Sequence, residues 1–234
     1  MGRADIHIHS GLVGGPAGLQ QLLQFVEQGT DLDVIALTGS DDIAPGQQAR
    51  EAAKSGSFRF EVVVGMEVTT QDGYLLALFI ERPVAPGLTM ARAAELVHSQ
   101  GGLCIVSHPM SWLDGSIGQG NLDRLMARRN GSTPDGLELI SAKLVSRGYT
   151  LRARHLNEKR YKVAEVGSSG ATKLEDIGRA YTVFPGRTSE DLRRALLERS
   201  SRAERARNLR PGMVLGPVRR LGDRLSRLWR GVPR

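Results

Sequence analysis

The segment Ala4-Asp5-Ile6-His7-Ile8-His9-Ser10 decides the fold, because apolar and polar side chains alternate in it with the period of a β-strand. Side chains two positions apart lie on the same face of a strand, so the pattern predicts that His7 and His9 project together. Two imidazoles at the C-terminal end of a strand are a metal-ligand arrangement. A half-buried strand whose polar face carries two histidines would show the same pattern, and the rest of the chain has to decide between the two interpretations.

Strand and helix patterns alternate outward from this segment with short connections. The predicted strands cover residues 4–10, 33–38, 60–70, 74–80, 103–107, 136–140, 163–166 and 181–184, and the helices lie near residues 19–29, 47–54, 90–100, 122–129, 150–161 and 188–198. Strands 60–70 and 74–80 are placed to pair as a hairpin across Asp72-Gly73. The alternation predicts an α/β fold with a mainly parallel sheet covered by helices, either closed as a barrel or open.

Polar residues gather where the predicted strands end. His9, the loop 39–42, Glu67, His108 and the loop 167–171 each lie at or just past the C-terminal end of a strand. In a parallel α/β barrel these strand ends meet at one face, and that face carries the active site. The sequence therefore predicts one functional face built from these residues.

Length and composition limit the class of protein. With 234 residues, 40% of them hydrophobic, the chain can bury one domain, or one domain and a tail. No apolar run approaches the roughly 20 residues of a membrane span, and the first strand begins too early to leave room for a signal peptide. The single cysteine, Cys104, cannot form an internal disulfide, which favours a reducing compartment. A cytoplasmic protein is expected.

Positive charge is concentrated at the C-terminal end. The formal net charge is +7, but residues 199–234 carry +9 and residues 1–198 carry −2. The charge split predicts a body over residues 1–198 and a basic amphipathic tail over residues 199–234. The basic stretch from Arg199 to Arg210 continues the last body helix in this prediction.

Residues 212–234 form a second helical pattern. An apolar stripe recurs at helical spacing, opposite a basic face, and comprises Val218, Leu221, Leu225, Leu228 and Trp229 against Arg219, Arg220, Arg224, Arg227 and Arg230. A basic amphipathic helix suits an anionic membrane surface, and such a helix would place the protein at the membrane periphery. Docking of the stripe on the barrel or on a partner, and binding of RNA or another polyanion, are the alternatives.

The chain resembles the PHP family, which is named for polymerase and histidinol phosphatase, from residue 4 to about residue 198. Five phrases carry the resemblance: His7-x-His9, Leu37-Thr-Gly-Ser-Asp41, Gly65-Met-Glu67-Val-Thr-Thr70, Ser107-His108-Pro109, and Gly167-Ser168 followed by Ile177-Gly-Arg-Ala-Tyr-Thr182. The resemblance implies a distorted (β/α)7 barrel with up to three divalent metals at its C-terminal rim. It also implies hydrolysis of phosphate esters, including nucleotides and RNA ends.

The family's ligand pattern is only partly present. His7, His9, Glu67 and His108 match family ligands, whereas the remaining ligand positions are occupied by Gly14, Ser40, Tyr74, Ser169 and Ala171. The third metal would have used three of these altered positions, so the resemblance implies that this metal site is lost. The four retained residues supply three nitrogens and a carboxylate, which could hold one Zn²⁺, Mn²⁺ or Fe²⁺.

Two functions follow from the resemblance and stay open at this point. One is a weak metal-dependent phosphoesterase acting on a phosphorylated small molecule or on a nucleotide or RNA end. The other is a non-catalytic scaffold, a pseudoenzyme, that binds a ligand or partner at the former active face. Arg179 could contact a phosphate, or could form a structural salt bridge.

Other polar residues are weaker candidates. Asp41, Asp42 and Asp72 could substitute as ligands near the rim or be solvated, and His98 and His155 are expected at the surface. A P-loop and a Gly-x-Ser-x-Gly elbow are both absent from the sequence, so P-loop nucleotide hydrolysis and serine hydrolysis have no support.

Overall fold

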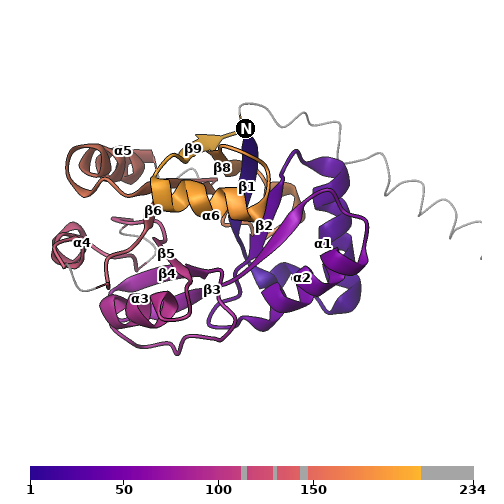
Figure 1. Cartoon of the computed structure of the whole chain (residues 1–234), viewed down its shortest axis with the longest axis horizontal. Helices are drawn as coiled ribbons and strands as arrows, with labels where there is room; N and C mark the ends of the chain where they lie inside the picture. The colour runs from indigo at the N-terminus through magenta and orange to yellow at the C-terminus, as the bar shows by residue number, and fades with distance from the viewer. Residues whose placement is uncertain (112–114, 129–130, 143–146, 207–234) are drawn as a thin grey trace, which may run out of the picture.

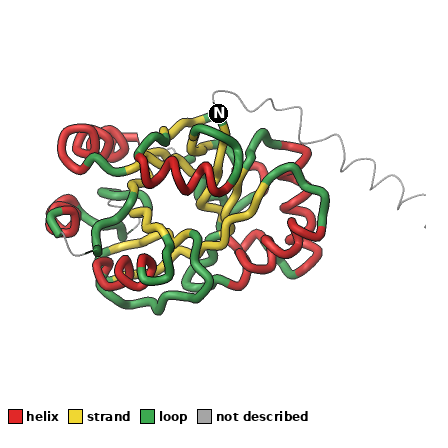
Figure 2. The backbone as a smooth tube through the Cα atoms, viewed as in Figure 1, coloured by secondary structure: helices red, strands yellow, loops and turns green. Residues whose placement is uncertain are grey.

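Nine strands form one curved sheet in the computed structural model, which describes residues 1–111, 115–128, 131–142 and 147–206 (Figures 1 and 2). The strands are β1 (Gly2–Ile8), β2 (Val34–Leu37), β3 (Glu61–Thr70), β4 (Gly73–Leu78), β5 (Leu103–Val106), β6 (Gly136–Ser141), β7 (Ala164–Ser168), β8 (Ala180–Phe184) and β9 (Arg202–Arg205). The helices are α1 (Pro16–Gly29), α2 (Ala44–Ser55), α3 (Met90–His98), α4 (Gln119–Met126), α5 (Arg147–Leu156) and α6 (Ser189–Glu198). The α/β class predicted from the sequence is confirmed.

The sheet nearly closes into a barrel. Its strand order is β7-β6-β5-β4-β3-β2-β1-β8-β9. Strand β8 and the residue before β9, at one end of this order, are hydrogen-bonded to β7, at the other end. The backbone N–H of Gly167 in β7 donates to the Thr182 hydroxyl of β8, and that hydroxyl donates back to the Gly167 carbonyl at 2.9 Å. The Ser201 hydroxyl, directly before β9, donates to the Glu165 carbonyl of β7. These bonds fasten β7 to the β8–β9 hairpin, so the interior is enclosed by strands on all sides.

The sheet is mixed, which differs from the mainly parallel sheet predicted. The pairs β1–β2, β2–β3, β5–β6 and β6–β7 are parallel, whereas β3–β4, β4–β5, β8–β1 and β8–β9 are antiparallel. The tight turn at Asp72-Gly73 explains the first of these reversals, because a short connection can join only antiparallel neighbours. The predicted hairpin across this turn is confirmed.

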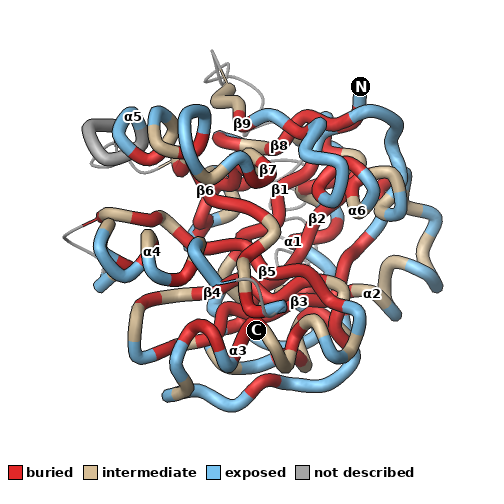
Figure 3. The backbone as a smooth tube through the Cα atoms, turned by 60° about the vertical axis from the view of Figure 1, so that its left-hand side comes forward, coloured by how far each residue is buried: buried red, intermediate tan, exposed pale blue. Residues whose placement is uncertain are grey.

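The core has an inner and an outer layer. The inner cluster fills the barrel with residues such as Ile6, Ala36 and Ile105, and Leu192 and Leu196 of α6 join it. Figure 1 shows α6 lying across the strands, and its first backbone N–H, from Ser189, donates to Glu61 at the start of β3. The helix therefore covers the N-terminal ends of the strands. The remaining helices pack against the outside of the barrel. Each of them has buried residues toward the strands and exposed residues toward the solvent (Figure 3).

A capping box fixes the start of α6. The Thr188 hydroxyl accepts from the backbone N–H of Asp191 at 3.1 Å, and the Asp191 carboxylate accepts from the backbone N–H of Thr188. We expect Thr188→Ala to lower the free energy of unfolding by about 1 kcal/mol, because an unpaired helix N–H is left. Urea unfolding measures this, with Thr188→Ser as the control that keeps the hydroxyl. An equal loss in both variants would contradict the capping role.

The chain after α6 differs from the prediction. The helix ends at Glu198, because Arg199 adopts a left-handed conformation (φ 60°) and the Ser200 N–H turns back to the Ala195 carbonyl. Arg202–Arg205 then form β9 against β8. The predicted continuation of the helix through Arg199–Arg210 is therefore wrong for the residues that are described.

Residues 207–234 lie outside the described residues, and with them the amphipathic pattern predicted for residues 212–234. Within the described part of the chain, none of the helices has the length and apolar character that crossing a membrane requires.

Candidate metal centre

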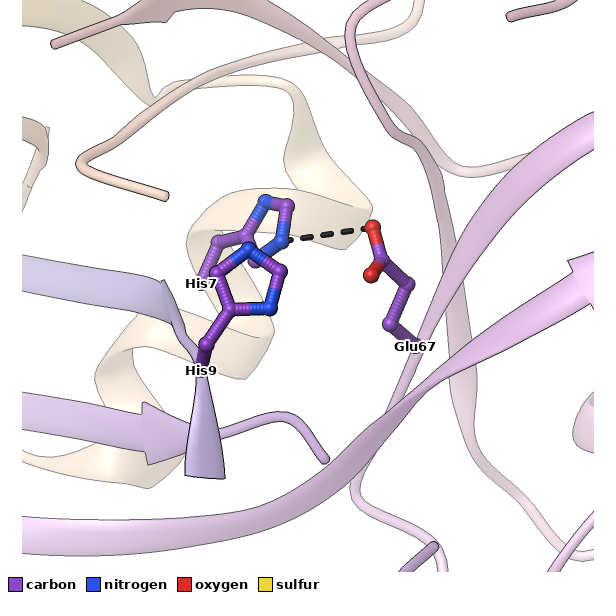
Figure 4. A group of neighbouring side chains, drawn as sticks. All are labelled: His7, His9 and Glu67. Carbon is purple, nitrogen blue, oxygen red and sulfur yellow. Dashed lines mark ion pairs between the residues drawn. The ribbon is translucent and has the colours of Figure 1, made fainter. Parts of the chain in front are cut away.

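Three predicted ligands come together at the C-terminal end of β1, beside the second half of β3. One ligand atom from each of His7, His9 and Glu67 lies within 4.8 Å of the other two. Figure 4 shows the imidazoles of His7, in β1, and of His9, just past its end, beside the Glu67 carboxylate of β3, with His7 Nε2 3.3 Å from Glu67 Oε1. The two rings are tilted by 55°, with their centroids 4.8 Å apart. The strand β2 lies between β1 and β3, so the curvature of the sheet brings these side chains together.

A β-bulge in β1 contributes to this arrangement. Asp5 pairs with Ile35 and Ile8 with Leu37, so three steps along β1 oppose two along β2. Ile6 consequently packs in the inner cluster, whereas Ile8 packs outside the barrel against α1. The strict alternation predicted for this strand breaks at the bulge, which is a common way to redirect side chains beside a functional site.

Glu138 is a buried carboxylate at the centre of the site that was not predicted from the sequence. His7 Nδ1 lies 3.0 Å from Glu138 Oε1, and the Ser168 hydroxyl donates to the same oxygen at 2.6 Å. The Ser107 hydroxyl and the His108 backbone N–H donate to the other oxygen, at 3.1 and 2.8 Å. A single charged residue inside the apolar strand β6 was the available signal, because such residues are rarely buried without partners.

The charges of the site stabilise one another. Burial alone raises the pKa of Glu138, but the charge and hydrogen bond of His7 outweigh it and lower the pKa of Glu138 to about 2. Burial likewise disfavours a charged His7, yet Glu138 and Glu67 raise the pKa of His7 to about 10. The pKa of Glu67 is lowered despite burial, through its interaction with His7, whose Nε2 lies 3.3 Å from Glu67 Oε1. The metal-free site thus holds a cationic imidazole between two carboxylates.

These residues fit a divalent ion. His7 Nε2 is buried and has no hydrogen-bond partner among the described residues, although it faces Glu67. When Nδ1–H is donated to Glu138, the lone pair of Nε2 points to the side where His9 and Glu67 lie. A carboxylate that orients a histidine in this way is the usual second shell of a metal-binding imidazole. Two nitrogens and a carboxylate oxygen suit Zn²⁺, Mn²⁺ or Fe²⁺.

His108 flanks the group of three. Its backbone has a positive φ of 31°, which is unusual for a residue other than glycine, and its N–H is held by Glu138. The ring lies 5.6 Å from the ring of Tyr74, and Nδ1 is buried without a hydrogen-bond partner within the described ranges. His108 is not among the three residues whose ligand atoms lie within 4.8 Å of one another. Its role as a ligand stays a prediction.

Thr38 is a second residue that sequence reasoning did not assign to the site. It follows β2 with the same parity as Val34 and Ala36, which both pack inside the barrel. Its backbone N–H donates to Ile8 of β1, and its hydroxyl is fully buried with no partner in the described part of the chain. Thr38 thus lies just past β2, the strand between those that carry His7 and Glu67, and its unpaired hydroxyl makes it a candidate for contact with a bound ligand.

We expect Thr38→Val to stabilise the metal-free protein by about 1 kcal/mol, because it removes a buried polar group that has no partner. The same change should weaken metal or phosphate binding, because valine cannot donate or accept a hydrogen bond. Thermal unfolding with and without added Mn²⁺ measures both effects, with Thr38→Ser as the matched control. A valine variant that is less stable in the metal-free state would show that the hydroxyl is already satisfied.

Four of the positions where the resemblance implies lost ligands lie near the predicted ligands. Ser40 forms a β-bridge with Glu67, the Ala171 carbonyl accepts from the backbone N–H of His9 at 3.0 Å, and the Ser169 hydroxyl accepts from Ala171 N–H. Tyr74 lies against His108, as described above, whereas Gly14 has open space around it. Ser40, Tyr74, Ser169 and Ala171 therefore adjoin the predicted ligands or their neighbours.

The weaker candidates have structural partners. Asp41, Asp42 and Asp72 each accept a backbone N–H, from Thr69, Ala44 and Met90 respectively. Arg179 pairs with Asp176 at 2.9 Å and donates to the Glu175 carbonyl, which agrees with the salt-bridge alternative, so a phosphate contact by Arg179 stays a prediction. His155 is exposed, as expected.

Known proteins share the fold of this chain. A family model described as PHP-associated matches residues 152–201. The uncharacterized protein MJ1587 of Methanocaldococcus jannaschii is 28% identical over 152 residues, which cover 60% of this chain and 82% of that protein. Together with the shared fold, these likenesses support the resemblance to the PHP domain family.

Two solved structures share the fold. A two-domain protein from Bacteroides vulgatus, which contains a predicted PHP-like metal-dependent phosphoesterase, is similar with a TM-score of 0.64 and 19% identity. The similarity covers 86% of this chain and 64% of that one. The lesion-specific endonuclease Q of Pyrococcus furiosus is similar with a TM-score of 0.53 and 14% identity, over 86% of this chain and 57% of the endonuclease. The chain thus spans less than two thirds of either protein.

Proposed function

We propose that this protein is a metal-dependent phosphoesterase whose reduced site holds one divalent ion, Zn²⁺, Mn²⁺ or Fe²⁺. His7, His9 and Glu67 are its ligands in this proposal, and His108 completes or flanks the site. The observation that carries the proposal is the convergence of the three ligand atoms within 4.8 Å, together with the Glu138 carboxylate that orients His7.

The ion and the residues around it have different roles in this proposal. A divalent ion would supply Lewis-acid chemistry, which polarises a phosphoryl oxygen and makes water more acidic. Glu138 keeps His7 in the tautomer that presents Nε2 to the ion, and the Ser168 hydroxyl holds Glu138 in place. The bound ion would take the place of the proton on Nε2, so metal binding is coupled to proton release.

A phosphate monoester or the end of a nucleotide or RNA is the substrate we infer. The similarity to endonuclease Q, which acts on lesions in nucleic acid, supports the nucleic-acid part of this inference. With a single ion the site lacks the second positive charge that metal clusters use to stabilise a leaving group. We therefore expect slow turnover, fastest on substrates with a good leaving group.

The experiment is a hydrolysis assay on protein prepared without chelator, with p-nitrophenyl phosphate and a 5′-phosphorylated oligoribonucleotide as substrates. Activity should require Mn²⁺, Zn²⁺ or Fe²⁺, and EDTA should abolish it. Activity that persists in EDTA would contradict the proposal. Bound metal without hydrolysis of any substrate would instead favour the non-catalytic scaffold.

A further inference from the structure

A second cluster of metal-binding side chains lies apart from the site at the ends of β1 and β3. His98 ends α3, Cys104 lies in β5, and Asp135 directly precedes β6. One ligand atom from each of the three lies within 4.8 Å of the other two. Cys104 and Asp135 lie at the N-terminal ends of two parallel strands, whereas His9 lies just past the C-terminal end of β1. The two clusters therefore occupy opposite ends of the barrel.

The side chains of this cluster are already oriented toward one another. His98 Nδ1 lies 2.6 Å from the carbonyl of Gly131, and Nε2 lies 2.8 Å from Asp135 Oδ2. A histidine whose second nitrogen donates to a backbone carbonyl has the usual orientation of a metal ligand. Asp135 is held in turn by the Cys104 backbone N–H at 2.7 Å, which brings its carboxylate to the residue that bears the thiol.

The metal-free cluster holds a positive charge at the position where a metal would lie. Both nitrogens of His98 face acceptors, so both donate and the ring is a cation, and the hydrogen bond to Asp135 raises the pKa of His98. Burial raises the pKa of the Cys104 thiol well above its ordinary value, so the sulfur is protonated until a metal stabilises the thiolate. A divalent ion would replace the proton on Nε2 and the proton on sulfur.

We propose that His98, Cys104 and Asp135 form a second metal site, selective for Zn²⁺ through its thiolate, at the end of the barrel opposite the phosphoesterase site. Imidazole, thiolate and carboxylate are all ligands of zinc, and thiolate favours zinc over Mg²⁺ or Mn²⁺. The side chains of His98 and Asp135 are 24% and 20% exposed, so an ion can enter from solvent although the thiol is buried. A bound ion would join α3, β5 and the start of β6.

Cobalt titration tests the site, because Cys104 is the only cysteine of the chain. A thiolate bound to Co²⁺ gives a charge-transfer band in the near ultraviolet, which the sulfur-free cluster of His7, His9 and Glu67 cannot produce. We expect wild-type protein to show this band and His9→Ala to retain it, whereas Cys104→Ser should lose it. Zn²⁺ should displace the cobalt and remove the band.

Two further variants keep the test decisive if Cys104→Ser does not fold. Asp135→Asn keeps an oxygen that can accept from the Cys104 N–H, and His98→Gln keeps an N–H that can donate to the Gly131 carbonyl. Each variant should weaken Co²⁺ binding at this site at least about tenfold. If folded wild-type protein binds Co²⁺ without a charge-transfer band, or if the band is as strong in Cys104→Ser as in wild type, the cluster is an ion pair beside a buried thiol and the proposal is wrong.

Discussion

Replacing His9 with alanine is expected to remove the ion held by His7, His9 and Glu67 together with the phosphoesterase activity. The three ligand atoms of His7, His9 and Glu67 lie within 4.8 Å, and the loss of one leaves a pair that cannot hold an ion in a fixed geometry. Loss of a partner outside the ligand shell typically weakens metal binding about 10- to 100-fold, so loss of a ligand should exceed about 100-fold.

Elemental analysis and the p-nitrophenyl phosphate assay measure the two effects of His9→Ala side by side. His155→Ala is the matched control, because this histidine is exposed on α5 and should leave metal content and turnover unchanged. Activity that survives in His9→Ala while metal is lost would place the chemistry elsewhere in the protein.

Replacing Glu138 with glutamine is expected to lower metal affinity about 10- to 100-fold without removing a ligand. The amide can still accept from the Nδ1–H of His7, but it lacks the negative charge that favours this orientation. The four donors that share two carboxylate oxygens in the wild type would face a single amide oxygen. Isothermal titration with Mn²⁺ measures the change. Glu158→Gln, at an exposed position, is the control. Unchanged affinity in Glu138→Gln would show that His7 is oriented by other contacts.

The same substitution should destabilise the metal-free protein by about 3 kcal/mol, because it leaves a buried cationic imidazole without its main partner. The pKa of Glu138 is lowered from 4.5 to about 2, so its contribution is present above pH 4.5 and is lost as the pH falls toward 2. The pKa of His7 is raised from 6.5 to about 10, so its contribution is present below pH 6.5 and is lost as the pH rises toward 10. The difference between wild type and Glu138→Gln should therefore be largest between pH 4.5 and 6.5.

Much of the fold could be predicted from local patterns. The first strand, the turn at Asp72-Gly73 and the helix over residues 188–198 depend on short-range physics, and each lies close to where the sequence predicts it. The continuation of the last helix was wrong, because a left-handed Arg199 and pairing of β9 with β8 outweigh helix propensity. Pairing between strands that are far apart in the sequence depends on tertiary contacts, so the sequence of β9 alone does not reveal it.

The site was predictable only in part for the same reason. His7 and His9 lie two positions apart at the end of β1, and Glu67 lies in a phrase that resembles a known family. Glu138 contacts His7 across 131 positions of sequence, and its importance depends on burial and on four donors from three other segments. The unpaired hydroxyl of Thr38 is likewise a property of packing. The contacts that orient a ligand are thus harder to predict than the ligand itself.

The metal content of protein prepared without chelator tests the central claim most directly. Wild type and Glu67→Ala should be purified in parallel and their Zn, Mn and Fe measured by elemental analysis, with folding checked by circular dichroism. The site predicts that wild type carries one more ion per chain than Glu67→Ala, whatever is bound at Cys104. Equal metal content in the two folded proteins would contradict a metal site formed by His7, His9 and Glu67.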